Sequence, residues 1–306
     1  MIKNKNKNKN KNKKLPLVSV ILNCYNSANF LEKSISSIIT QTYSNWELII
    51  FDNCSNDNTK TVIKKFKKNK KIRYFRSNKL INLYHARNLA IKKSKGSIIT
   101  FVDADDWWMR NKLKTQVKLL EKNKNLNIIY SNLFLFYEKK KIKKLFTNKK
   151  LYNGMITQKL LNNFKMPILT TMIRKKIFVK NKFNEKYNII GDFDLFLRLS
   201  LNEKILSTQK PLAYYRVHEK NMTRKKINLN IDELEHWFKI NKKKKMFKNY
   251  NLKNLKNIIK SLKIKKEFIS GNIFQAIKEL FCRPFNFNNL KYLVIIFLPK
   301  KIVNIL

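Results

Sequence analysis

Glycine is scarce in this chain. Its 306 residues include only 4 glycines, Gly96, Gly154, Gly191 and Gly271, and no two of them lie close together. Phosphate-binding loops of the G-x-x-x-x-G-K-[ST] type and dinucleotide-binding turns of the G-x-G-x-x-G type need glycines a few residues apart. The sequence therefore excludes both of these classes of nucleotide-binding protein.

Cysteine and histidine are equally few, with 3 residues of each. The cysteines, Cys24, Cys54 and Cys282, are too few for a disulfide framework and lack the C-x-x-C spacing of zinc sites. No stretch approaches the ~20 apolar residues that a membrane-spanning helix requires. The N-terminal residues lack the apolar region of a signal peptide. We therefore expect a cytoplasmic protein.

Acidic residues number 19 against 68 Lys and Arg, so the formal net charge is +49 at pH 7. This charge would attract nucleic acids or an anionic membrane surface, which makes a nucleic-acid-binding protein one hypothesis. The excess is Lys rather than Arg and accompanies many Asn and Ile, as an AT-rich coding sequence would produce without any ligand. No recognisable nucleic-acid-reading motif is present, so we expect no specific nucleic acid partner.

The chain divides into three regions by composition. Residues 1–14 alternate Lys and Asn and are predicted to form a disordered tail. In residues 15–224, short apolar runs alternate with helical patterns, which predicts an α/β domain with a mainly parallel sheet flanked by helices. Strands are expected at 17–22, 46–51, 72–75 and 97–102, and a basic connecting segment at 138–150. Ligands bind beyond the carboxyl ends of the strands in such sheets.

Residues 225–306 are predicted to form a basic helical extension. Within it, residues 239–266 hold 12 Lys and no acid, with Ile, Leu and Phe at helical intervals, and residues 292–298 add a short apolar run. A basic helix with an apolar stripe can lie on an anionic membrane surface, which would place the protein on the inner face of the membrane. The stripe could instead pack on the preceding domain, and the sequence leaves both alternatives open.

Three aspartates follow one predicted strand closely. Asp103, Asp105 and Asp106 come directly after the apolar run at 97–102. Side chains two residues apart in an extended segment point the same way, so Asp103 and Asp105 project together. Their mutual repulsion favours a bound cation, and carboxylate oxygens suit Mg²⁺ or Mn²⁺. A solvated turn that caps the next helix explains the same pattern, and spacing alone does not choose between them.

An ordered set of motifs gives a family resemblance. In chain order they are 18–26 (VSVILNCYN), 51–59 (FDNCSNDNT), 86–88 (ARN) and 95–106 (KGSIITFVDADD). Together they resemble the opening strand, the D-[DN]-x-S-x-D-x-T turn, the A-R-N helix and the DXD strand of family 2 glycosyltransferases. A weaker resemblance continues through 191–198 and 215–218, while the tail and the C-terminal extension lie outside it.

The resemblance implies a GT-A fold that binds a nucleotide-diphosphate sugar, with a UDP-sugar favoured. Asn23 and Tyr25 would border the base of the donor. Asp52 would contact the nucleoside, and Arg87 would face the base or the phosphates. Asp103 would lie near the ribose and the metal.

The resemblance also implies a metal site and a catalytic base. Asp105 would bind Mn²⁺ or Mg²⁺ together with Asp103, and His218 would reach the metal or the diphosphate. Asp192 stands where the family has its general base, although Gly191 replaces the Glu that usually precedes it. A helix N-cap explains Asp192 equally well, and a structural histidine explains His218.

These observations combine into one interpretation. The chain resembles an inverting, metal-dependent glycosyltransferase that moves a sugar to a glycan or lipid-linked acceptor hydroxyl, as in surface polysaccharide biosynthesis. The alternatives are a basic nucleic-acid-binding protein and an inactive glycosyltransferase-like scaffold. The presence of Asp103, Asp105 and Asp192 argues against the scaffold.

Overall fold

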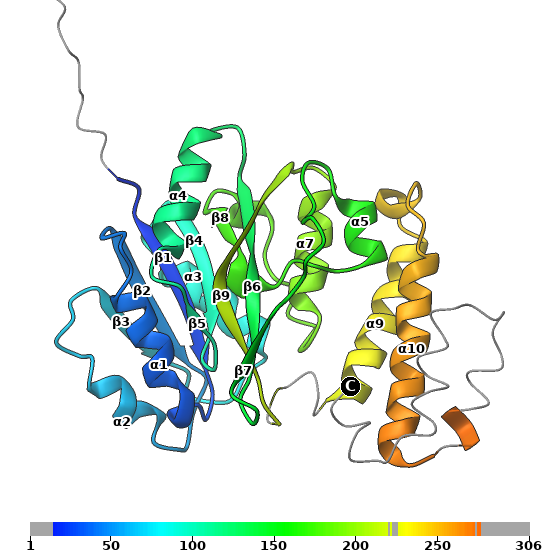
Figure 1. The fold of residues 1–306 in the computed structure, drawn as a ribbon, viewed down its shortest axis with the longest axis horizontal. Coiled ribbons are helices and arrows are strands. Elements are labelled where there is room, and N and C mark those ends of the chain that lie inside the picture. The colour runs from blue at the N-terminus through cyan, green and yellow to red at the C-terminus, as the bar shows by residue number, and fades with distance from the viewer. Residues whose placement is uncertain (1–14, 220, 222–225, 273, 277–306) are drawn as a thin grey trace, which may run out of the picture.

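The computed structural model describes residues 15–219, 221, 226–272 and 274–276. The predicted tail at 1–14 and the apolar run at 292–298 lie outside the described residues. A mixed sheet runs through the described chain in the order β3-β2-β1-β4-β8-β6-β9-β5, and β7 pairs with β6 (Figure 1). The strands are β1 (Val18–Cys24), β2 (Trp46–Asp52), β3 (Ile72–Arg76), β4 (Ile98–Asp103), β5 (Trp107–Trp108), β6 (Ile128–Tyr137), β7 (Ile142–Leu145), β8 (Met172–Arg174) and β9 (Ile205–Val217).

The parallel part of the sheet consists of β3, β2, β1 and β4. All seven residues of β1 and all seven of β2 are buried, as continuous apolar runs in a sheet covered on both faces should be. Successive residues of β1 point to opposite faces of the sheet: Val20 and Leu22 belong to one apolar core, and Ile21 belongs to the other. The four strands expected from the sequence are confirmed.

Helices cover both faces of this sheet (Figure 1). Buried residues of α1 and α4 join the core that contains Val20, and those of α3, α5 and α7 join the core that contains Ile21. The α/β fold class predicted from the sequence is thereby confirmed. The helices are α1 (Ala28–Ile39), α2 (Thr59–Lys64), α3 (Leu83–Lys93), α4 (Lys112–Lys122), α5 (Thr157–Asn162), α6 (Ile177–Lys180), α7 (Gly191–Ser200), α9 (Ile227–Lys242) and α10 (Lys253–Ser270), with short 3-10 turns η1 (Ile168–Thr170) and η2 (Lys245–Phe247).

The second half of the sheet is mixed. Strand β8 is antiparallel to β4 and β6, whereas β9 runs parallel to β6 with register shifts between Ser131 and Phe134. The basic stretch at 138–150, expected as a connection, contains the turn and second strand of a β6–β7 hairpin. Propensity alone does not reveal β7, because four exposed residues form a strand only through their pairing with β6.

The C-terminal helices α9 and α10 are present as the sequence predicted, and much of the apolar stripe at 239–266 is buried or packs against a buried core. Phe247, Leu255 and Ile259 are at most 5% exposed and belong to the core that also holds Ile21 of the sheet. Of the two alternatives for this stripe, the structure therefore favours packing on the preceding domain. The domain boundary at residue 224 stays a prediction. Within the described residues, no helix has both the length and the apolarity needed to cross a membrane.

Candidate active site

The carboxyl ends of β1, β2 and β4 meet at one edge of the sheet. In the parallel register, Asn23 of β1 lies opposite Asp103 of β4, and Cys24 lies opposite Asp52 of β2. Three of the residues expected at the donor site are therefore neighbours. They come together because consecutive βα units of a parallel sheet bring their strand ends to the same edge.

Asn23 has an unusual environment at this edge. Its side chain is only 8% exposed, yet neither its amide nitrogen nor its amide oxygen has a hydrogen-bond partner among the described residues. A buried polar group without a partner costs about 1–3 kcal/mol, so such groups are rare unless something else satisfies them. Tyr25, two residues on, is 46% exposed. The end of β1 therefore carries a buried, unpartnered amide at Asn23 and an exposed aromatic ring at Tyr25.

Asp52 is fully buried, and its carboxylate is engaged by the protein. One oxygen accepts the Ser55 amide at 2.9 Å, and the other accepts the Tyr74 hydroxyl at 2.8 Å and Arg76 at 3.2 Å. Burial, together with the hydrogen bond to Asp52, raises the pKa of Tyr74 to about 12. The contacts assign Asp52 to holding the turn after β2. A contact between Asp52 and a nucleoside stays a prediction.

Arg87 of α3 is paired with Asp103. Its side chain is 4% exposed, and one Nη2–H donates to Asp103 Oδ1. Burial alone would lower the pKa of Arg87, but Asp103, Tyr84 and Asp192 together outweigh burial and raise the pKa. Arg87 is therefore a buried counter-charge at the strand ends rather than a surface cation. Asp103 itself keeps 34% of its side chain exposed.

Asp105 contacts residues from the end of β9. Its Oδ2 lies 2.9 Å from His218 Nε2 and 3.4 Å from Asn221 Nδ2, and its backbone carbonyl accepts Arg216 Nε at 2.8 Å. The structure thus brings the predicted pair Asp105 and His218 into contact. Asn221, which is 5% exposed, was not predicted from the sequence. Its position three residues after His218 is the only local signal for it.

Asp106 has a structural environment unlike that of its neighbours. It is 1% exposed, and its Oδ1 accepts the Arg216 amide at 2.8 Å while Oδ2 has no partner among the described residues. Burial, reinforced by the charges of Asp105 and Asp103, raises its pKa well above the ordinary value. Asp106 therefore fixes the end of β9 against the turn that carries Asp105.

Asp192 is the second residue of α7 and is partly buried. Its Oδ1 accepts the Phe193 amide at 2.9 Å and lies 3.3 Å from the Tyr84 hydroxyl. Burial raises the pKa of Asp192, and the nearby Arg87 opposes that rise. Tyr84 was missed from the sequence, although it lies three residues before Arg87 on one helix and so shares its face. Asp103, Arg87, Tyr84 and Asp192 form one connected group.

The glycine before Asp192 has a steric explanation. A Cβ added at Gly191 would lie 2.4 Å from Cδ2 of Tyr84, and the ring fills the space that a longer side chain would need. The chain therefore cannot hold a Glu at this position without moving Tyr84. Asp194, which the sequence assigned a structural role, accepts hydrogen bonds from Arg198 at 2.9 Å and from Trp237 at 3.0 Å.

The predicted metal ligands do not form one cluster. Among the residues that the structure describes, no group of three or more His, Cys, Asp and Glu side chains lies close enough to hold a metal ion. Arg87 engages one oxygen of Asp103, which leaves Asp105 and His218 as the adjacent pair. Binding of a metal by all three predicted ligands stays a prediction.

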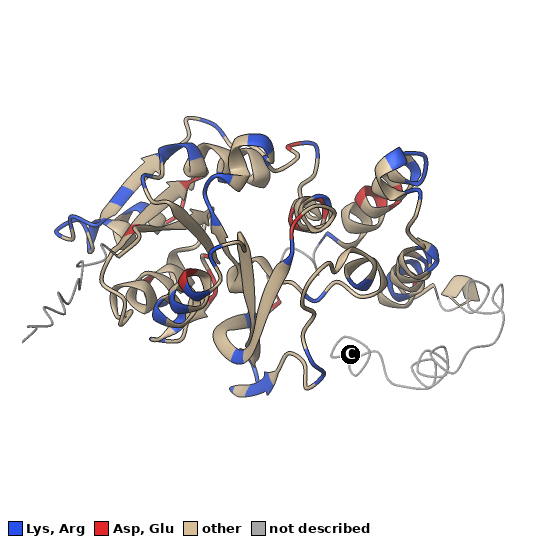
Figure 2. Cartoon of the chain, turned by 90° about the horizontal axis from the view of Figure 1, so that it is seen from above, with Lys and Arg blue, Asp and Glu red and all other residues tan. Residues whose placement is uncertain are grey.

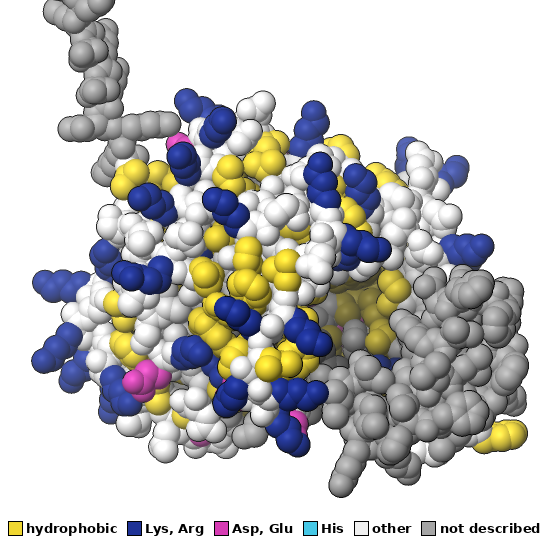
Figure 3. Space-filling view, viewed as in Figure 1, with side chains coloured by type: hydrophobic (Ala, Val, Ile, Leu, Met, Phe, Trp, Pro, Cys, Tyr) yellow, Lys and Arg dark blue, Asp and Glu magenta, His cyan; other side chains and the backbone are white. Residues whose placement is uncertain are grey.

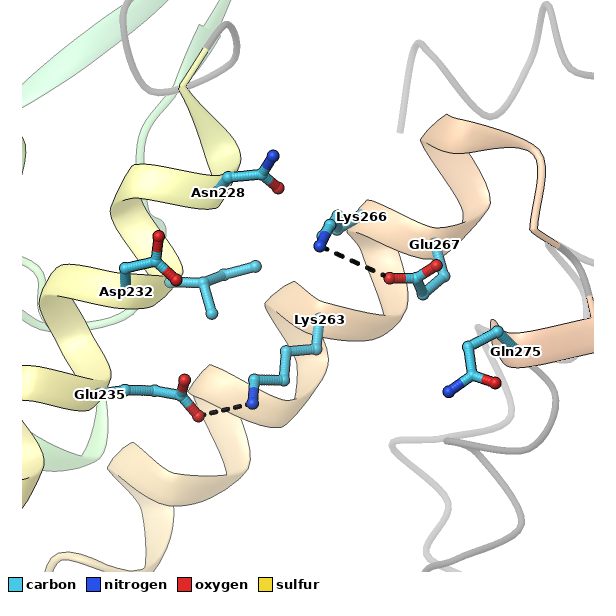
Figure 4. A pocket seen from close by; sticks show the side chains of 8 residues that line it. Asn228, Asp232, Glu235, Lys263, Lys266, Glu267 and Gln275 are labelled. Carbon is cyan, nitrogen blue, oxygen red and sulfur yellow. Dashed lines mark ion pairs between the residues drawn. The ribbon is translucent and has the colours of Figure 1, made fainter.

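A polar cavity of about 400 Å³ lies elsewhere, between α9 and α10 (Figure 4). Ion pairs between Lys263 and Glu235 and between Lys266 and Glu267 stand at its wall. None of its lining residues was predicted as a functional residue, and it is separate from the strand ends. The candidate site is therefore at the strand ends, where the predicted acidic and basic side chains meet. The lining residues are Asn228, Ile231, Asp232, Glu235, Lys263, Lys266, Glu267 and Gln275.

Residues 19–187 match the family model described as glycosyl transferase family 2. The UDP-Glc:alpha-D-GlcNAc-diphosphoundecaprenol beta-1,3-glucosyltransferase WfgD of Escherichia coli is 32% identical over 190 residues, which are 62% of this chain and 72% of that protein. An uncharacterised glycosyltransferase of Rickettsia bellii is 32% identical over 209 residues, which are 67% of this chain but 29% of that protein.

A solved structure with a similar fold is a mannosyltransferase from Pyrobaculum calidifontis in complex with GDP-Man and Mn²⁺. It superposes with a TM-score of 0.59 at 14% identity, covering 91% of this chain and 79% of that one. At this identity the likeness establishes the fold alone.

Proposed function

Because the chain belongs to glycosyl transferase family 2 and is a nucleotide-sugar glycosyltransferase, we propose that it transfers a hexose from a UDP-sugar to a hydroxyl of a lipid-linked glycan, with inversion of the anomeric centre. The name of the similar Escherichia coli protein, a UDP-Glc-dependent transferase acting on a diphosphoundecaprenol-linked sugar, supports this donor and this acceptor. The observation that carries the proposal is the buried, unpartnered carboxamide of Asn23 beside Asp103 at the strand ends.

Donor binding is proposed at this edge of the sheet. The Asn23 carboxamide has both a donor and an acceptor to offer to a base edge, and the Tyr25 ring is exposed beside it. Asp103, held in place by Arg87, has a second carboxylate oxygen for a ribose hydroxyl or a metal ion. Asp52 contributes chiefly by fixing the turn after β2, with a direct nucleoside contact as a further expectation.

Asp105 and His218 are the residues proposed to hold Mn²⁺ or Mg²⁺. The fit is favourable, because the Asp105 side chain is partly exposed and its Oδ2 lies 2.9 Å from His218 Nε2. Such ions take one or two carboxylates, with substrate phosphates supplying further ligands. The chemistry supplied by a bound ion is neutralisation of the charge that develops on the departing diphosphate. Asn221 and Arg216 keep Asp105 and the end of β9 in register for this role.

Asp192 is proposed to act as the general base. Its Oδ1 is engaged by the Phe193 amide and Tyr84, which leaves Oδ2, without a hydrogen bond to a described residue, to accept a proton. The acceptor hydroxyl gives that proton to Oδ2 while its oxygen bonds to the anomeric carbon and the bond to the diphosphate breaks. The raised pKa makes Asp192 a stronger base than an exposed carboxylate. One displacement of this kind inverts the anomeric centre.

A lipid-linked acceptor implies that the enzyme works at the cytoplasmic surface of a membrane. Nucleic-acid binding is the rival that the charge of +49 suggests. Family membership favours an enzyme over that rival, and the two make different predictions about salt and ligands.

A donor panel tests the proposal. UDP-glucose, UDP-N-acetylglucosamine, GDP-mannose and dTDP-glucose, each with Mn²⁺, are compared by thermal shift and by donor hydrolysis, since a true donor stabilises the fold by mass action. A UDP-sugar should give the largest shift and be hydrolysed. Stabilisation without hydrolysis or transfer would favour an inactive scaffold. A steep salt-dependent affinity for DNA or RNA with no donor-induced shift would overturn the proposal in favour of nucleic-acid binding.

A further inference from the structure

The β6–β7 hairpin presents an exposed basic and apolar segment. Every residue from 139 to 145 is exposed, and five of the seven are lysines. The other two are Ile142, 43% exposed, and Leu145, 38% exposed. Both are large apolar side chains that remain exposed in the described residues, and here they lie among five lysines.

An aromatic ladder continues this surface across the sheet. Residues directly opposite in the register share a face, which places Leu145 beside Phe134, Phe134 beside Tyr214, and Tyr214 beside Trp107. The Trp107 and Tyr214 rings stack at 4.8 Å, and those of Phe134 and Tyr214 at 5.4 Å. In Figure 3, apolar side chains gather over β5, β9, β6 and β7 with Lys and Arg among them.

Lysines lie over the rings of this ladder. The Lys33 ammonium is 3.6 Å from the centroid of the Trp107 ring, and that of Lys143 is 5.3 Å from the Phe134 ring. Aromatic rings with an apolar body, and lysines whose stems lie along apolar surface, are the side chains that favour a membrane–water interface.

The same surface is joined to the active site. Arg216, which lies opposite Phe136 of β6 in the register, forms an ion pair with Glu138 at the hairpin turn and donates to the backbone carbonyl of Asp105 at 2.8 Å. Its guanidinium also lies 4.7 Å from the Trp107 ring. A partner on the hairpin would therefore sit at the edge of the proposed metal site.

We propose that the hairpin surface, meaning residues 139–145 with the partly exposed Phe134 and Tyr214 of the ladder, docks on an anionic phospholipid membrane. This inference rests on the proposed function, because a lipid-linked acceptor places its reacting hydroxyl at such a surface. The lysines are attracted to the anionic headgroups. Leu145, on the ladder face of β7, and Ile142, on the opposite face of the same strand, both enter the apolar boundary. The docked hairpin turns the carboxyl ends of the strands toward the acceptor.

Charge alone does not select this surface. Lys and Arg recur along the whole chain drawn in Figure 2, and residues 60–71 carry a comparable run of lysines. That run contains no large apolar side chain among those found exposed in the described residues. It therefore offers a control with matched charge but without the apolar element.

Vesicle co-sedimentation of the full chain tests the proposal. Vesicles of phosphatidylcholine with phosphatidylglycerol are compared with pure phosphatidylcholine at low and high salt. The hairpin variant carries Lys→Gln at Lys139, Lys140, Lys143 and Lys144, and the control variant carries Lys→Gln at Lys60, Lys64, Lys67 and Lys68. We expect at least tenfold weaker binding to anionic vesicles for the hairpin variant and less than a threefold loss for the control, although both lose the same charge.

A second variant, Ile142→Ser with Leu145→Ser, should weaken binding to anionic vesicles about fivefold while keeping every lysine. Donor hydrolysis in solution should be unchanged in all these variants, so a failure of docking is separable from a failure of the proposed function. Equal losses in the hairpin and control variants, or unchanged binding of the serine variant, would overturn the proposal. Binding of the full chain to a soluble glycan through the hairpin, without binding to the vesicles, would also overturn the proposal.

Discussion

Replacing Glu233 by glutamine removes a buried charge that holds the segment just before α7. Glu233 lies on α9, is 7% exposed, and accepts the backbone amides of Asn188 at 2.6 Å, Ile189 at 2.8 Å and Ile190 at 3.1 Å. Asp192 lies two residues after this segment. The helix α9 thus fixes the approach to the proposed base, from a part of the chain beyond the family match at residues 19–187.

The size of the effect follows from these three bonds. A hydrogen bond to a charged group contributes about 1.5–3 kcal/mol, and bonds that share one carboxylate do not add fully. Glutamine keeps one oxygen as acceptor but turns an NH₂ group toward at least one buried amide. We therefore expect Glu233→Gln to lower the free energy of unfolding by about 2–4 kcal/mol.

Urea unfolding measures this change directly. The matched control is Glu235→Gln on the same helix, where a pair with Lys263 is exposed on both sides, so the loss there should be below about 1 kcal/mol. At a low temperature at which Glu233→Gln remains folded, its kcat should fall at least tenfold with little change in the donor KM, because the displaced segment leads into Asp192. A loss below about 0.5 kcal/mol for Glu233→Gln would show that these three hydrogen bonds do not hold the segment before α7.

Three further predictions follow from other sites. Burial lowers the pKa of Lys112 well below its ordinary value, so the unfolded chain binds a proton that the native state does not. The free energy of unfolding of the wild type should therefore rise from pH 7 to 9.5, and urea unfolding of Lys112→Met should lack that rise. Gly191→Ala should lower stability by about 1–3 kcal/mol through its clash with Tyr84, and calorimetry should find a smaller loss in a Tyr84→Leu background. Asp105→Ala should abolish the Mn²⁺-dependent thermal shift caused by the donor, while the melting temperature without ligand stays within about 2 °C. The control is Asp232→Ala, which removes an exposed carboxylate on α9 and should keep that shift.

The sequence predicted the strands and the acids that follow them, because these are local properties. Continuous apolar runs identify buried strands, and an aspartate after such a run must lie at the sheet edge where strand ends meet. The family resemblance added the donor residues and Asp192. The predicted neighbours Asp105 and His218 are in contact in the structure, and the sequence offered no geometric argument for that contact.

The remaining contacts could not be predicted because they join distant segments. Tyr84 meets Gly191 only after α3 and α7 pack on the same face of the sheet. Glu233 lies on α9 and reaches residues 188–190 from a distant part of the chain. The strand β7 depends on pairing with β6, and its lysines gave no strand signal in the sequence. The apolar stripe of residues 239–266 showed a helical period but not which surface would bury it.

Base catalysis by Asp192 is tested by comparing sugar transfer by the wild-type enzyme and by Asp192→Asn under single-turnover conditions. With the best UDP-sugar of the panel and a diphosphate-linked lipid acceptor, the wild type should form one glycosidic bond of inverted configuration, read by NMR. The Asp192→Asn variant should bind the donor with unchanged affinity and transfer sugar roughly 10²-fold or more slowly. A retained configuration, or full transfer by the variant, would contradict the account.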